Sequence, residues 1–283
     1  MSLSDFSLEG KKAIVVGARR GMGKAFAIGF AEAGADVAIA DVEVTDGLLD
    51  SVGEQIREFG RCILTVPTDI SKKADVDNLV HKTITEFGTI DILANVAVMY
   101  HPSSLLDLNE QDWDTLTAVN LKGYWLTCQA VAPIMKERRK GSIINMTSRG
   151  GLRAHGETVL GNYSITKAGI AMLTRQMCRL LGPYNVRVNA IAPSLVRPDP
   201  PRDATFLHQP AGMTEKEVRQ MRERAWEREF GPRGIVLGRV AEPEEMANAA
   251  VFLASDAASY ITGAICVSMV VTWPSARHDD KMN

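Results

Sequence analysis

A tyrosine and a lysine one helical turn apart are the residues of this sequence best suited to chemistry. Tyr163 and Lys167 are four positions apart, so on a helix their side chains share one face and can interact. A free phenol has a pKa of about 10 and is a poor acid–base group at neutral pH unless a nearby cation favours the phenolate. Lowering this pKa by about three units takes roughly 4 kcal/mol. The pair therefore predicts a proton-transfer site, although the same spacing also occurs by chance in helices where the tyrosine packs and the lysine is solvated.

A glycine-rich turn near the N-terminus predicts a nucleotide-binding loop. The apolar run 12–16 is followed by Gly17, Gly21 and Gly23, and then by a segment with helical periodicity. This order predicts a strand, a tight turn and a helix. Glycines there let the backbone approach a pyrophosphate, whose charge is bound by the amides of the helix N-terminus. The spacing G-x-x-x-G-x-G differs from the general G-x-G-x-x-G fingerprint.

An acidic residue ends the second predicted strand and bears on the choice of nucleotide. Asp41 lies about two dozen residues after Gly17, where a carboxylate can accept hydrogen bonds from an adenosine ribose, or simply cap the next helix. It favours NAD and repels the 2′-phosphate of NADP, whereas Arg19 and Arg20 could pair with that phosphate. We expect NAD, because a carboxylate that faces a phosphate costs more than an exposed arginine gains; NADP remains the alternative.

The order of these motifs resembles that of the short-chain dehydrogenase/reductase family, over about residues 8–273. The resemblance rests on the glycine turn and on Asp41, Asp69, Asn95, Asn120, Ser148, Tyr163, Lys167 and the Asn-Ala-Ile-Ala-Pro segment from Asn189. It implies an NAD(P)-dependent oxidoreductase that interconverts a secondary alcohol and a ketone by hydride transfer.

The resemblance also implies a role for each site residue. Tyr163 would be the general acid–base, Ser148 would position the substrate oxygen, Lys167 would lower the tyrosine pKa and bind the nicotinamide ribose, and Asn120 would hold a water in a proton relay. No metal is expected. The implied cofactor-binding residues are Gly17, Arg19, Arg20, Gly21, Met22, Gly23, Asp41, Asp69, Ile70, Asn95, Val96, Ala97, Tyr163, Lys167, Pro193 and Val196.

Strand-like and helix-like runs alternate along the chain, which predicts an α/β fold with a parallel sheet covered by helices on both faces. We expect one doubly wound, Rossmann-type domain over 1–283, in which the resemblance implies the strand order 3-2-1-4-5-6-7. The carboxyl ends of strands one, four and five then surround one crevice, where ligands bind in such sheets. The predicted strands are 12–16, 36–41, 62–66, 90–94, 141–147, 186–191 and 264–268. The predicted helices are 21–34, 45–59, 72–87, 109–138, 162–182 and 243–255.

Residues 194–238 interrupt this alternation, and we expect them to form a flap over the substrate. The proline-rich turn 197–203 cannot continue a helix or a central strand, and the capping box 214–217 begins a charged helix with an apolar stripe. A helix that docks on a neighbouring subunit would show the same pattern. The apolar stretch 267–273, at the start of a tail placed at 269–283, could likewise cover a subunit contact.

Three segments depart from the family pattern. The usual threonine before the first glycine is Val16, the usual Asn-Asn-Ala-Gly is 95–98 with Val96 and Val98, and the usual Asp-Gly-Gly is Met-Val-Val at 269–271. Valine in place of glycine forbids positive φ, so we expect a reshaped adenosine side of the cleft. These departures support a second hypothesis, a non-catalytic subunit that keeps the fold as a scaffold or partner of an active relative.

Composition excludes several classes of protein. With 283 residues, 46% hydrophobic residues and a formal charge of -2, the chain can bury one core and lacks the charge of a nucleic-acid-binding protein. Four scattered cysteines indicate reduced thiols, and the absence of a signal-like N-terminus or a long apolar run predicts a cytoplasmic protein without a membrane segment. Resemblance implies a homotetramer or dimer. Arginines after Ser148 and in 194–238 allow an anionic substrate, although neighbouring glutamates make ordinary surface arginines the alternative.

Overall fold

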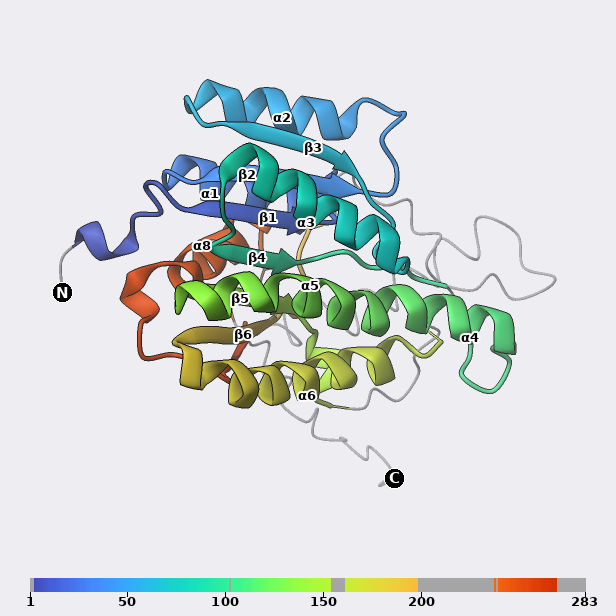
Figure 1. Ribbon diagram of the computed structural model, residues 1–283. Coiled ribbons are helices and arrows are strands. Elements are labelled where there is room, and N and C mark those ends of the chain that lie inside the picture. Colours follow the sequence, from blue (N-terminus) through green and yellow to red (C-terminus); the bar gives the residue numbers. More distant parts are fainter. Residues whose placement is uncertain (1–2, 102, 154–160, 198–236, 238, 269–283) are drawn as a thin grey trace, which may run out of the picture.

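A seven-stranded parallel sheet forms the centre of the protein (Figure 1). In this computed structural model the described residues are 3–101, 103–153, 161–197, 237 and 239–268. The strands are β1 (Lys12–Val16), β2 (Asp36–Asp41), β3 (Ile63–Pro67), β4 (Ile92–Asn95), β5 (Gly141–Met146), β6 (Val186–Ala192) and β7 (Ile265–Val267). The α-helices are α1 (Gly21–Glu32), α2 (Leu48–Glu58), α3 (Lys73–Phe87), α4 (Glu110–Thr117), α5 (Gly123–Arg138), α6 (Tyr163–Leu181) and α8 (Pro243–Ala254). Short helical turns are η1 (Leu3–Phe6), η2 (Ala118–Lys122), η3 (Arg149–Gly151), η4 (Gly182–Tyr184) and η5 (Asp256–Ala258).

The strand order is β3-β2-β1-β4-β5-β6-β7, which confirms the predicted order. All neighbouring strands are parallel, so their carboxyl ends meet at one edge of the sheet, on the right in Figure 1. The order reverses between β1 and β4, and such a reversal is the usual place of a ligand crevice.

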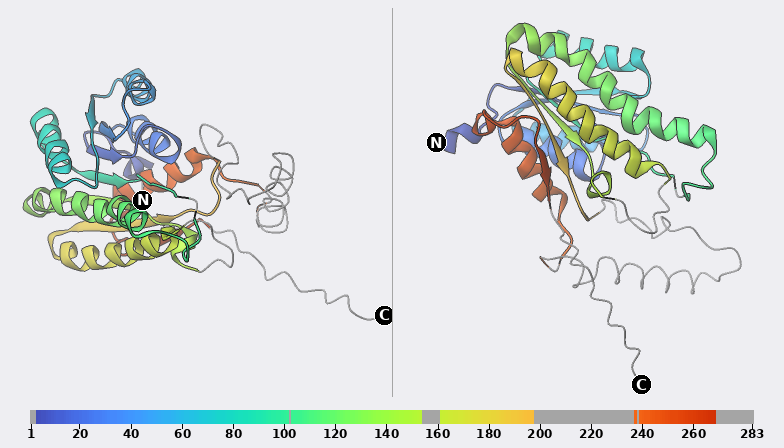
Figure 2. Two further views of the ribbon diagram at one scale, coloured as in Figure 1. Left: turned by 90° about the vertical axis from the view of Figure 1, so that its right-hand side faces the viewer. Right: turned by 90° about the horizontal axis from the view of Figure 1, so that it is seen from below.

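Helices cover both faces of the sheet, which explains the apolar character of its central strands. α1, α2 and α8 lie on one face, and α3, α5 and α6 lie on the other (Figure 2). Every residue of β4, and all but the first residue of β1 and β5, is buried. Strands buried on both faces have no solvent side, so they read as nearly continuous runs of valine, isoleucine and alanine.

The long helix predicted at 109–138 is divided into three parts, whereas the other predicted elements agree with the structure within about three residues. α4 ends at Thr117, the π-helical turn η2 follows, and α5 begins at Gly123. A π-helical turn adds a residue to the helix, and such turns often mark functional sites. Sequence periodicity did not reveal this division, because the turn continues helical φ and ψ values at both of its ends.

Most of the predicted flap and tail, 198–236, 238 and 269–283, lies outside the described residues. The two ends of the flap segment are joined. Val196 and Ala241 form a parallel β-bridge, and the Arg197 amide donates to the Ala241 carbonyl at 2.8 Å. Among the described helices none is long and apolar enough to cross a membrane, and the described residues hold no cluster of three or more His, Cys, Asp or Glu that suits a metal ion.

Candidate active site

Ser148 and Tyr163 meet at the carboxyl edge of the sheet, as the sequence predicted. Ser148 comes two residues after β5, and its hydroxyl forms a hydrogen bond with Tyr163, the first residue of α6. The Ser148 oxygen also accepts from the Gly150 amide at 3.1 Å, which fixes its direction. The start of α6 is anchored by Asn162, whose side-chain amide donates to the Trp113 carbonyl at 3.1 Å. Two hydroxyls are therefore held side by side where a substrate oxygen could bind between them.

Lys167 lies one turn along α6 and is fully buried. Its ammonium donates to the Met146 carbonyl at 2.7 Å and lies 5.6 Å from the centre of the Tyr163 ring. Burial lowers the pKa of Lys167 to about 7, because the interior solvates the ammonium poorly. The structure thus brings together the tyrosine and the lysine that the four-residue spacing predicted.

The predicted lowering of the tyrosine pKa by Lys167 is not observed. The pKa of Tyr163 lies well above its ordinary value because burial disfavours the phenolate, and the neighbouring Tyr100 raises it further. The hydrogen bond with Ser148 acts in the opposite direction and is the weaker influence. The spacing gave the position of the ammonium correctly, but it contained no information on the cost of burying the phenolate.

Asn120 is buried in η2, and its side chain fixes the loop after β4. Its oxygen accepts from the Met99 amide and its nitrogen donates to the Met99 carbonyl, both at 2.8 Å. These two bonds use one N–H donor and one oxygen lone pair of the amide, so a second donor and a second lone pair remain for the water that the relay requires.

The glycine turn is packed tightly and leaves helix amides available. Gly17 has φ 81°, and a Cβ on it would lie 2.5 Å from the Cα of Ala97; a Cβ on Gly23 would lie 1.8 Å from the Gly17 carbonyl oxygen. Arg20, the N-cap of α1, makes no side-chain cap, so the first amides of α1 keep unused donors. This cradle fits a dinucleotide pyrophosphate.

Asp41 and Arg19 interact with each other beside this turn. The Asp41 carboxylate accepts from the Arg19 amide at 3.2 Å, and the Arg19 guanidinium lies 3.9 Å from it and pairs more closely with Asp46. Arg19 is therefore held by two carboxylates, whereas Arg20 is exposed at the start of α1.

Asn95 and Val96, predicted to bind the cofactor, turn their side chains into the core. The side-chain nitrogen of Asn95 donates to Asn145 at 2.9 Å and its side-chain oxygen accepts from Thr127 at 2.8 Å, so this side chain is held in the core and does not face a ligand. Val96 packs in the hydrophobic core and does not fill the crevice. Among the described residues other than glycine only Arg139 and Asn185 have positive φ, so the chain passes 95–98 without the conformation that glycine would allow.

The remaining predicted cofactor residues occupy the same edge with varied contacts. Asp69 binds Ser71 and Lys72, and although burial raises its pKa, these hydrogen bonds lower it overall. Ile70 is buried, and the Pro193 carbonyl accepts from the Arg149 amide at 3.0 Å.

Two tyrosines at the site were not identified from the sequence. Tyr100 stacks on Tyr163 with ring centres 4.9 Å apart and its hydroxyl 3.4 Å from that of Tyr163. Tyr124 lies fully buried beside Lys167, with 3.5 Å between its hydroxyl and the ammonium. The available signal for Tyr124 was its position four residues after Asn120, on the same helix face.

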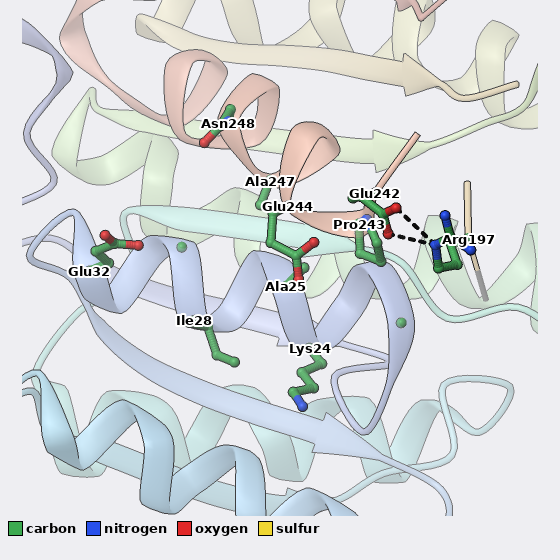
Figure 3. Close-up of a pocket in the computed structure, with 12 residues that line it drawn as sticks. Lys24, Ala25, Ile28, Glu32, Arg197, Glu242, Pro243, Glu244, Ala247 and Asn248 are labelled. Atoms are coloured by element: carbon green, nitrogen blue, oxygen red, sulfur yellow. Dashed lines mark hydrogen bonds and ion pairs between the residues drawn. The ribbon is translucent and has the colours of Figure 1, made fainter. Parts of the chain in front are cut away.

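The hollow in Figure 3 is a different feature. It has a volume of about 370 Å³ between the outer surfaces of α1 and α8 and contains the ion pair of Arg197 with Glu242. None of Asn120, Ser148, Tyr163 and Lys167 lines it. The hydrogen-bonded hydroxyls, and not this hollow, define the candidate active site.

Comparison with known proteins identifies the family of this chain. A family model described as enoyl-(acyl carrier protein) reductase matches residues 17–268. The chain is 35% identical over 258 residues to a 3-oxoacyl-(acyl-carrier-protein) reductase of Thermotoga maritima, covering 91% of this chain and 96% of the relative.

Solved structures of similar proteins share the fold over nearly their whole length. A short-chain type dehydrogenase/reductase from Mycobacterium marinum has a TM-score of 0.80 at 30% identity, covering 94% of this chain and 96% of that one. A 7α-hydroxysteroid dehydrogenase, in complex with NADH and 7-oxo glycochenodeoxycholic acid, has a TM-score of 0.78 at 29% identity, covering 94% of this chain and 96% of that one.

Proposed function

The chain belongs to the short-chain dehydrogenase/reductase family of oxidoreductases, and on that premise we propose that it interconverts a secondary alcohol and a ketone with NAD as cofactor. The observation that carries the proposal is the hydrogen bond between Ser148 and Tyr163, with the Lys167 ammonium one turn away. A group that transfers a proton must lie within hydrogen-bond reach of the reacting oxygen, and two hydroxyls that are hydrogen-bonded to each other can both reach the same substrate oxygen.

Each residue has a task in this reaction. Ser148 and Tyr163 bind the substrate oxygen, and Tyr163 donates or accepts its proton. The Lys167 ammonium, 5.6 Å from the centre of the Tyr163 ring, would favour the phenolate against the burial that raises its pKa, and Asn120 holds the loop that carries Tyr100 in place. A bound nicotinamide would supply or accept the hydride, held by the turn from Gly17 and by the first amides of α1.

NAD is the proposed cofactor because of the arrangement around Asp41. Its carboxylate, at the end of β2 beside the glycine turn, would accept hydrogen bonds from the ribose hydroxyls, and Arg19 is already paired with Asp41 and Asp46. A 2′-phosphate would meet the negative charge of Asp41 and gain only Arg20 as an exposed partner. The preference is measured as the ratio of kcat/KM with the two nucleotides.

The substrate proposed here is a ketone or secondary alcohol. The relative from Thermotoga maritima is named for a 3-oxoacyl thioester, so such thioesters belong in a test panel beside simple ketones and steroid ketones. An anionic substrate remains part of the proposal, since Arg153 is exposed five residues after Ser148. Anionic members of the panel test it directly.

Turnover of this panel, followed at the nicotinamide absorbance, tests the proposed reaction. Tyr163→Phe should lower kcat by at least about a thousandfold while nucleotide affinity stays within about threefold, because the phenol ring remains and only the proton donor is lost. Comparable turnover in the variant would refute the role of Tyr163. Failure of the wild-type protein to bind NAD or NADP in a thermal-shift titration at millimolar concentration would favour the alternative, a non-catalytic scaffold subunit.

We also propose a homo-oligomer built on α5 and α6, as a dimer or tetramer. Exposed apolar side chains lie on these neighbouring helices, with Trp125 43% and Met172 53% exposed, together with Ile165. Large apolar side chains that are exposed on packed neighbouring helices are typical of an interface, if they form one patch. Light scattering of wild-type protein and of Trp125→Glu measures the assembly and its dependence on this surface.

A further inference from the structure

Tyr124 lies in the interior between the catalytic lysine and the nucleotide turn. The proposed reaction gives Tyr124 no task, yet its hydroxyl lies 3.5 Å and its ring centre 5.1 Å from the Lys167 ammonium. We infer that Tyr124 is a positioning residue: its hydroxyl holds the Lys167 ammonium beside Tyr163 and links it to the loop that packs on the nucleotide turn. This inference rests on the proposed function.

The donors of the Lys167 ammonium show why this hydroxyl matters. An ammonium has three N–H donors. The Met146 carbonyl accepts one at 2.7 Å, and the Tyr124 oxygen is the second acceptor. Within the described ranges no carboxylate forms an ion pair with Lys167, so its charge depends on neutral oxygens and on the faces of Tyr124 and Tyr163. The third donor is left for the active site.

The orientation of the Tyr124 hydroxyl is fixed by its own proton. It donates to the Ala97 carbonyl at 2.9 Å, so its lone pairs are left for the ammonium. Ala97 is the residue against which Gly17 packs, since a Cβ on Gly17 would lie 2.5 Å from the Ala97 Cα. One chain of contacts therefore runs from Lys167 through Tyr124 and Ala97 to the nucleotide turn.

Removal of the Tyr124 hydroxyl should lower the pKa of Lys167 further. The titratable groups around Lys167 are Tyr124 on α5, Tyr163 on α6, Tyr100 stacked on Tyr163, and Cys128 beside Tyr124. These groups are three phenols and a thiol, and none is a carboxylate that could replace the lost acceptor with a carboxylate charge. In Tyr124→Phe the ammonium should lose its proton at a pH lower by about one unit, and turnover above neutral pH should fall accordingly.

The experiment compares Tyr124→Phe with the matched variant Tyr184→Phe. Tyr184 also carries a lysine over its ring, with Lys136 at 4.3 Å, but it lies in η4, away from the active site. We expect Tyr124→Phe to move the high-pH limit of kcat down by about one pH unit, roughly a tenfold loss at pH 8, with nucleotide affinity within about threefold. Tyr184→Phe should match the wild-type profile.

A second readout separates this inference from the proposed reaction. In protein labelled with ¹³C at the lysine ε-carbon, the resonance missing from Lys167→Met identifies Lys167, and its titration midpoint should fall by about one unit in Tyr124→Phe. An unchanged midpoint would overturn the inference even if the enzyme is active. If the wild-type protein turns over no member of the panel, the proposed function fails and the NMR midpoint alone decides the role of Tyr124.

Discussion

Gly23 provides a sharp test of the nucleotide turn, because helix propensity and packing predict opposite effects for Gly23→Ala. Gly23 is the third residue of α1, where alanine in place of glycine would ordinarily stabilise the helix by up to about 1 kcal/mol. A Cβ at this position would lie 1.8 Å from the Gly17 carbonyl oxygen and 2.7 Å from its carbonyl carbon. Both atoms belong to the backbone and cannot rotate away.

The loss of stability in Gly23→Ala depends on how far the turn at Gly17 can shift. Gly17 is fixed by the hydrogen bond from its amide to the Ala40 carbonyl at 2.8 Å, so relief requires the turn to shift on the sheet. Overpacking of this kind costs about 1–3 kcal/mol, and a rigid backbone partner places it at the upper end. After the stabilisation that alanine gives the helix is subtracted, we expect the free energy of unfolding to fall by about 2 kcal/mol and Tm by roughly 5 °C. Nucleotide binding should be lost as well.

Gly53→Ala is the matched control. Gly53 lies inside α2, and a Cβ there would meet nothing closer than 3.6 Å, an ordinary contact with Ile63. This variant should be as stable as the wild-type protein or more stable by about 0.5–1 kcal/mol. Urea unfolding followed by circular dichroism measures both variants, and fluorescence titration measures nucleotide affinity. If Gly23→Ala is stabilised as Gly53→Ala is, the tight packing of the turn is refuted.

Three further substitutions test the electrostatics of the site. Asp41→Ser removes the carboxylate that would face a 2′-phosphate and leaves Arg19 paired with Asp46, so the NAD to NADP ratio of kcat/KM should fall at least about tenfold, and an unchanged ratio contradicts the assignment of Asp41. Tyr100→Phe keeps the stacked ring but removes a hydroxyl that raises the pKa of Tyr163, so the low-pH limit of alcohol oxidation should move to lower pH; no movement means that Tyr100 acts only through its ring. Lys167→Met should be more stable than the wild-type protein by at least about 1 kcal/mol below pH 7. Burial lowers the lysine pKa from 10.5 to about 7, so between these pH values the unfolded chain binds a proton that the folded chain does not. The wild-type protein therefore gains stability as the pH rises through this range. A difference in free energy of unfolding between Lys167→Met and the wild-type protein that stays constant up to pH 10 would disprove this.

Local patterns in the sequence determined the elements of the fold and the pairs that lie within one element. Buried strands could be recognised in the sequence as apolar runs, and helices by the spacing of their apolar residues, because the direction of a side chain depends on the φ and ψ angles of its own segment. Tyr163 and Lys167 share a face of α6 for this reason, and the glycine turn could be read because Gly17 needs its positive φ whatever surrounds it. The strand order came from the family resemblance combined with these elements.

Tertiary structure decided what surrounds each of these side chains. Asn95 was predicted to follow the strand 90–94, but it is the last residue of β4, and its side-chain amide faces Asn145 in the core and not the crevice. Tyr100 and Tyr124 reach Tyr163 and Lys167 from segments far away in the sequence, so no spacing could place them. The pKa values of Tyr163 and Lys167 depend on burial by the whole sheet and its helices, and burial is a property of the folded chain that no short stretch of sequence contains.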